Sequence, residues 1–143
     1  MAIANLAETI RTSIYRKAAL QQRELELRAQ KRILTLEQND EQMLLNAQKA
    51  EIDDYYEDQY EQNEDLQVEY SSFRELPDYE DEIKKITAKT DDNIERLVNQ
   101  ELVIDSQIAS ISAESIYWGN IGDSARSLIK EVISGDFSYG ITG

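Results

Sequence analysis

The sequence predicts an all-α fold: an elongated antiparallel coiled-coil helical hairpin with a short third helix at the C-terminus. Three observations lead to this prediction. Residues 3–76 contain no glycine and no proline and are rich in residues that favour helices. The only proline of the chain, Pro77, follows directly and marks a turn. Beyond it, mostly apolar residues recur every seven positions as far as Trp118. We therefore expect one elongated domain over residues 1–143.

The first helix is predicted over residues 3–76. At about 1.5 Å per residue it would be on the order of 110 Å long, more than the diameter of a compact domain of this size. In its N-terminal half an apolar stripe repeats every eleven residues, and this period predicts a nearly straight helix. The stripe contains Ile3, Ile14, Leu25, Leu36 and Ala47, with Leu6, Ile10, Ala18, Ala29 and Ile33 beside them.

The C-terminal part of this helix is strongly acidic. Between Glu51 and Glu82, fourteen acidic residues accompany a single basic one, Arg74, and this segment carries nearly all of the net charge of −14. Carboxylates near the C-terminal end of a helix oppose its dipole and repel one another. We expect this section to depend on packing or on cations for its order.

A second helix is predicted over residues 78–118, because Asp78 and the acidic residues after it suit a helix N-terminus. The loop 119–122 contains two glycines and predicts a break, followed by a third helix over 123–134. The tail 135–143 is expected to be frayed or to form an edge strand with a partner. The predicted hairpin seam consists of Ile52, Leu66, Phe73, Ile83, Leu97, Ile104, Ile111 and Trp118.

A tight turn at Pro77 also predicts which residues meet across the hairpin. It would place Leu36 opposite Trp118 and would leave residues 3–35 without a partner in the chain, except for the short third helix. An unpaired apolar stripe of that length indicates self-association or a bound partner. The predicted oligomer interface consists of Ile3, Leu6, Ile10, Ile14, Leu25, Ile33, Leu128 and Val132.

Tyrosines interleaved with carboxylates near the turn suggest a docking site for a basic partner, since aromatic rings beside carboxylates bind Arg and Lys side chains well. The simpler interpretation is that Tyr56 and Tyr70 belong to the seam, and for Tyr55 and Tyr60 both interpretations stay open. The predicted docking residues are Asp54, Tyr55, Glu57, Asp58, Tyr60 and Glu61. The same carboxylates lack the spacing of a calcium loop, so no metal or cofactor is predicted.

Composition argues against several classes of function. The chain has no cysteine and no histidine, which removes the usual nucleophile, general base and zinc ligands and predicts a protein that is not an enzyme. Its acidic field disfavours nucleic acid. The apolar runs are too short for a membrane span, and nothing near the N-terminus resembles a signal peptide. We expect a cytoplasmic location, or export into an assembly without a cleaved signal.

The hypothesis that these patterns favour is a structural protein, a self-associating hairpin subunit of a filament, particle or export apparatus, with its acidic tip as a docking surface. Its partners would be further copies of itself or another helical protein. The alternative is a soluble acidic adaptor or chaperone that binds a basic client protein. A binding module regulated by cations is a third, weaker option.

Overall fold

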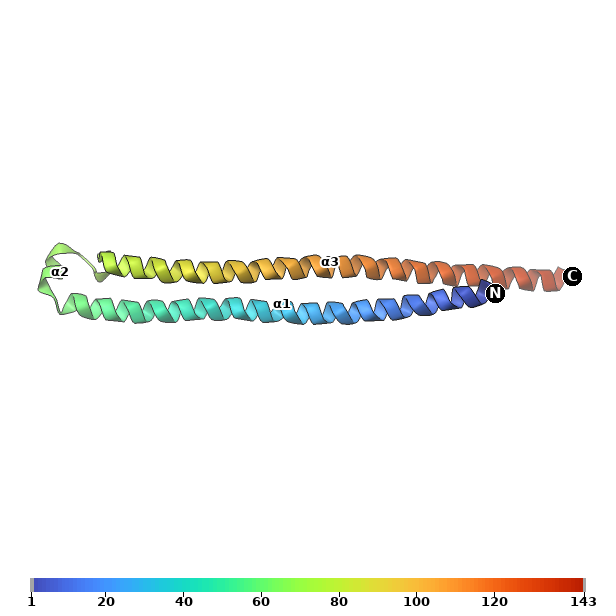
Figure 1. Cartoon of the computed structure of the whole chain (residues 1–143), viewed down its shortest axis with the longest axis horizontal. Coiled ribbons are helices and arrows are strands. Elements are labelled where there is room, and N and C mark those ends of the chain that lie inside the picture. Colours follow the sequence, from blue (N-terminus) through green and yellow to red (C-terminus); the bar gives the residue numbers. More distant parts are fainter. Residues whose placement is uncertain (1, 143) are drawn as a thin grey trace. The chain divides into compact units, whose positions relative to one another are not determined.

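The computed structural model describes residues 2–142, and the side chains of residues 2–135. Its elements are α1 (Ala2–Glu61), α2 (Glu64–Glu69), a 3₁₀ turn (Phe73–Glu75) and α3 (Pro77–Thr142), and no strand occurs among the described residues. The all-α prediction is confirmed for the described residues, and α1 packs against α3, which is consistent with a helical hairpin (Figure 1). Within the described part of the chain, no helix combines the length and hydropathy needed to cross a membrane.

The chain divides into two compact units. Unit 1 consists of two segments, the residues up to Gln30 and those from Val103 onward. Unit 2 is Lys31–Leu102. Within unit 2, Thr35 donates a hydrogen bond to Glu101 at 2.7 Å, and Asn93 donates one to Glu41 at 3.2 Å. Later residues of α1 therefore meet earlier residues of α3, so the two helices are antiparallel in this unit.

The first helix ends at Glu61, fifteen residues before the predicted end at residue 76. Its last turns are acidic and contain no basic residue, so they oppose the helix dipole. The Asn63 side chain then accepts a hydrogen bond from the backbone N–H of Asp65 and caps α2, whose first turn carries Glu64 and Asp65. The acidic residues thus destabilise the last turns of α1 and stabilise the first turn of α2.

The connection from α2 to α3 follows the restrictions that proline imposes. Leu76 adopts an extended conformation, with φ −63° and ψ 130°, as expected for the residue before a proline. Pro77 is the first residue of α3, a position where its missing N–H costs nothing. Asp78 and Glu80 lie in the first turn, where they complement the helix dipole.

Because residues 62–76 form the connection, the pairing between the helices differs from the predicted one. Trp118 was expected opposite Leu36, but in unit 1 it lies against Arg16, whose Cζ is 5.8 Å from the centroid of the Trp118 ring. The expectation that residues 3–35 lack a partner in the chain is therefore wrong. Unit 1 packs the start of α1 against the part of α3 from Val103 onward.

The predicted loop at 119–122 and the separate third helix over 123–134 are also wrong, because α3 continues without a break to Thr142. Glycine destabilises a helix interior by roughly 0.5–1 kcal/mol relative to alanine. At position 122 a larger residue would not fit, because a Cβ there would lie 2.5 Å from Ser13 Oγ. The contact between the helices therefore offsets the cost of glycine. The glycine lets α1 and α3 approach closely in unit 1. The tail from 135 to 142 is likewise helical, and residue 143 lies outside the described residues.

The face of α1 that packs against α3 is not the predicted eleven-residue stripe. Leu27 and Leu45 are buried, whereas Leu25 and Leu36 are 64% and 56% exposed. The buried positions follow steps of three, four and seven residues, but many of them are polar. This face includes the buried or half-buried residues Leu6, Ile10, Ser13, Leu20, Glu24, Leu27, Lys31, Leu34, Gln38, Glu41, Leu45, Gln48 and Ile52.

Candidate docking surfaces

A cleft of about 390 Å³ lies at the connection in unit 2, and we name it the turn cleft. Its walls come from the end of α1, from α2 and from the start of α3. Aromatic rings and carboxylates line it together, which is a chemistry suited to positively charged groups. The lining residues are Tyr55, Tyr56, Gln59, Leu66, Glu69, Tyr70, Leu76, Pro77 and Asp78.

Edge-to-face ring contacts hold the aromatic residues of the connection. The Tyr56 ring centroid is 5.0 Å from that of Tyr55 and 5.7 Å from that of Tyr79. The Phe73 ring in turn meets Tyr79 at 5.4 Å. Such pairs contribute about 0.5–1.5 kcal/mol beyond the area that they bury. The 3₁₀ turn is thereby tied to both helices of the hairpin.

Two phenol groups in this cluster bond to carboxylates. Burial raises the pKa of Tyr56 above its ordinary value, and a hydrogen bond to Glu82 raises it further. Burial also raises the pKa of Tyr79, whose Oη donates a hydrogen bond to Asp53 Oδ1. In both cases the neutral phenol is favoured in the folded state. The tyrosines therefore act as donors that satisfy two of the carboxylates in the acidic segment.

The structure separates the predicted docking residues into two kinds. Tyr60 is half-buried, and its Oη donates a hydrogen bond to the Tyr70 carbonyl oxygen at 2.8 Å, so this tyrosine has a structural contact. Tyr55 is 58% exposed and lines the turn cleft. The remaining predicted residues, Asp54, Glu57, Asp58 and Glu61, are exposed on the last turns of α1. Sequence reasoning missed Glu69 and Asp78, although the Asn63 cap and Pro77 signal the bends that bring them into the cleft.

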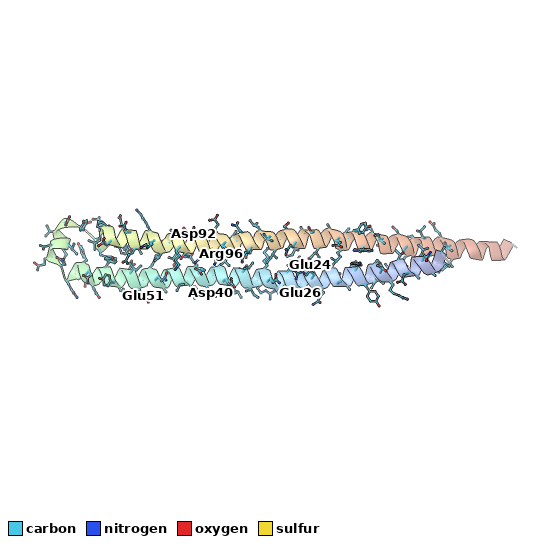
Figure 2. The ribbon with its side chains drawn as sticks, viewed as in Figure 1. Glu24, Glu26, Asp40, Glu51, Asp92 and Arg96 are labelled. Atoms are coloured by element: carbon cyan, nitrogen blue, oxygen red, sulfur yellow. The ribbon has the colours of Figure 1, made fainter. Side chains whose placement is uncertain are left out.

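A second surface lies on α1 in unit 2, on the side of the helix away from α3. Ile33, Leu36 and Met43 are 55%, 56% and 68% exposed, and Ala47 and Ala50 are also exposed. Together with Asp40, which Figure 2 places on this side, they follow steps of three and four residues. We name these six residues the outer stripe. It overlaps the eleven-residue pattern, which marks a solvent-facing side of the helix.

The residues predicted to form the oligomer interface do not share one environment. Ile3, Ile14, Leu25, Ile33 and Leu128 are exposed, whereas Leu6, Ile10 and Val132 are half-buried. Among the predicted seam residues, Leu97 and Ile104 are buried, and Ile52, Ile83, Ile111 and Trp118 are half-buried. Leu66 and Phe73 are half-buried too, but they belong to α2 and the 3₁₀ turn instead of α1.

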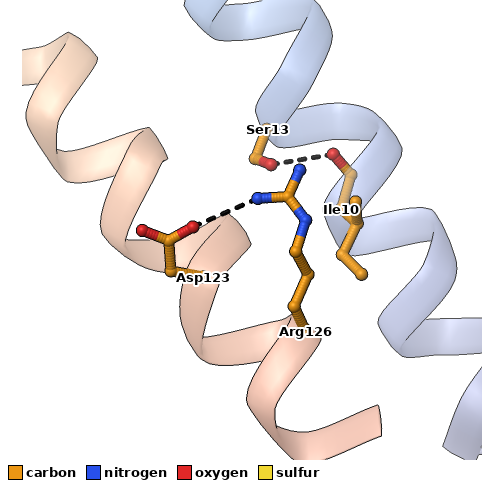
Figure 3. Close-up of polar contacts among 4 residues, drawn as sticks. All are labelled: Ile10, Ser13, Asp123 and Arg126. Carbon is orange, nitrogen blue, oxygen red and sulfur yellow. Dashed lines mark hydrogen bonds and ion pairs between the residues drawn. The ribbon is translucent and has the colours of Figure 1, made fainter. Parts of the chain in front are cut away.

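In unit 1 Gly122 of α3 lies against Ser13 of α1, and Figure 3 shows Ser13 on α1 near Asp123 and Arg126 on α3. Ser13 is buried, and its Oγ donates a hydrogen bond to the Ile10 carbonyl oxygen at 2.7 Å. On the facing helix Arg126 pairs with Asp123 at 3.1 Å. This exposed ion pair contributes little to stability, at most about 1 kcal/mol. The close approach therefore depends on the small size of Gly122 and Ser13.

Comparison with known proteins gives no match: no family model fits the chain, and neither a curated protein nor a solved structure is significantly similar to it. Within the described residues, no group of three or more acidic, histidine or cysteine side chains is placed to hold a metal ion. We base the proposed function on two surfaces, the turn cleft and the outer stripe.

Proposed function

We propose that this chain is a non-enzymatic structural protein that self-associates as a subunit of a larger assembly, with a coiled-coil seam between α1 and α3. The observation that supports the proposal is the outer stripe. Five of its six residues are apolar, all lie on one side of α1 in unit 2, and none is covered by α3. Apolar residues at steps of three and four are the pattern by which one helix packs on another.

The proposal predicts that the outer stripe controls self-association. In sedimentation velocity runs at rising concentration, the wild-type chain should shift to larger species. The double variant Leu36→Gln/Met43→Gln should stay monomeric. At concentrations low enough to keep the wild type monomeric as well, its melting temperature should match that of the wild type, because both side chains are already exposed. Val68→Gln is the matched control, since Val68 is 89% exposed and lies in α2. A wild-type monomer at every concentration would refute the proposal.

A second candidate function is an acidic adaptor that binds a basic client protein, and the turn cleft supports it. The exposed Tyr55 ring stands in a cleft with Glu69 and Asp78, so an Arg or Lys side chain would meet an aromatic face and carboxylates together.

This function predicts that an arginine-rich synthetic peptide binds, and that affinity falls as salt increases because the charges are exposed. Fluorescence anisotropy of a labelled peptide measures the binding. Tyr55→Ala should weaken binding about two- to five-fold, as expected for one exposed cation–π contact. Tyr15→Ala, which removes a 69% exposed tyrosine in unit 1, should leave binding unchanged. Equal losses in both variants would count against the cleft.

A further inference from the structure

The size of the side chains in the outer stripe changes from one end of the stripe to the other. Its large side chains, Ile33 and Leu36, lie at the N-terminal end, and its small ones, Ala47 and Ala50, lie at the C-terminal end. Interfaces between helices pack densely when large residues face small ones. A parallel pair of α1 helices would instead stack isoleucine on isoleucine and alanine on alanine.

Resting on the self-association proposed above, we infer that the partner on the outer stripe is the outer stripe of a second copy, in antiparallel orientation. In one alignment of the two antiparallel helices, each of the six positions of one copy faces one of the six positions of the other. Ile33 then faces Ala50, Leu36 faces Ala47 and Asp40 faces Met43, each contact occurring twice about a two-fold axis. The contact is self-complementary, so two copies close it.

Charge favours the same orientation. Arg32 is exposed and lies just before the outer stripe in the sequence. Glu51 and Asp54 are also exposed and lie just after it. In the antiparallel pair, Arg32 of each copy lies level with the start of the acidic run of the other copy. In a parallel pair, the acidic run of one copy would lie along that of the other, and the repulsion would oppose association. Packing and charge thus select one geometry independently.

Disulfide trapping tests the alignment, and the absence of native cysteine makes each introduced thiol unique. Ile33→Cys and Ala50→Cys are made in the full-length chain, with a mass tag on one of them, and are oxidised mildly alone and in an equimolar mixture. Both positions are exposed, so the variants should fold. We expect a disulfide-linked dimer only in the mixture. In either variant alone, the two thiols would be about 25 Å apart along the helix, too far for a bond.

A mixture of Ile33→Cys with Met43→Cys is the off-register control, because those thiols would be about 10 Å out of line and should not link. Disulfide dimers of Ile33→Cys alone or of Ala50→Cys alone would indicate parallel pairing and overturn the inference. Wild-type association without a disulfide in any mixture would overturn it as well, while leaving self-association itself intact. A wild-type monomer would refute both proposals, so the two failures are distinguishable.

Discussion

Replacing Leu27 with alanine is expected to lower the free energy of unfolding by about 2–4 kcal/mol, as for large core side chains that leave a cavity. Leu27 is 1% exposed and is the largest fully buried side chain of the described residues. Its methyl groups pack in the interface between α1 and α3 of unit 1. Denaturant unfolding followed by circular dichroism at 222 nm gives the free energy, at a concentration low enough to avoid self-association.

Leu25→Ala is the matched control for this experiment. The same chemical change two residues away removes a side chain that is 64% exposed, so stability should change by no more than about 0.5 kcal/mol. The pair of variants distinguishes the two faces of α1. If Leu25→Ala were the more destabilising of the two, α1 would pack through the eleven-residue stripe, and the arrangement described for unit 1 would be wrong.

Replacing Gly122 with valine is expected to lower the free energy of unfolding by about 1–3 kcal/mol, the usual cost of overpacking. A Cβ there would lie 2.5 Å from Ser13 Oγ and 3.4 Å from Ser13 Cβ, so the two helices would have to separate. The measurement is again unfolding by denaturant. Gly135→Val is the control, because nothing lies within 4 Å of a Cβ at Gly135 and no clash is expected.

The Ser13→Ala variant tests whether contact with Ser13 causes the loss of stability expected in Gly122→Val. Removing Oγ takes away the nearest clashing atom, so the Ser13→Ala/Gly122→Val double variant should lose less stability than the two single variants combined. A coupling of about 0.5 kcal/mol or more is expected for residues in direct contact. Strict additivity would mean that Gly122 does not face Ser13 and that the two helices do not approach closely at this point.

The candidate sites were only partly predictable from sequence. Tyr55 was predicted as a docking residue, and it is exposed in the turn cleft. The cleft itself was not predictable, because Glu69 and Asp78 approach it through two bends whose angles depend on packing. Part of the outer stripe was detected in the eleven-residue pattern, but Leu36 was expected to face Trp118 across the hairpin and is instead 56% exposed. The periodicity of a sequence shows that a helix has an apolar face, but it does not show which segment, if any, covers that face.

The chain's helical class, its turn before Pro77 and its acidic connection follow from the amino-acid sequence, because they depend on local propensity and on the steric restriction of proline. The unbroken course of α3 past Gly122 and the pairing of Trp118 with Arg16 depend on tertiary packing. Polar residues such as Gln38 and Glu41 occupy the packed face of α1, while Leu25 and Leu36 face water. Local hydrophobicity therefore could not identify that face, since burial depends on which residues the partner helix presents.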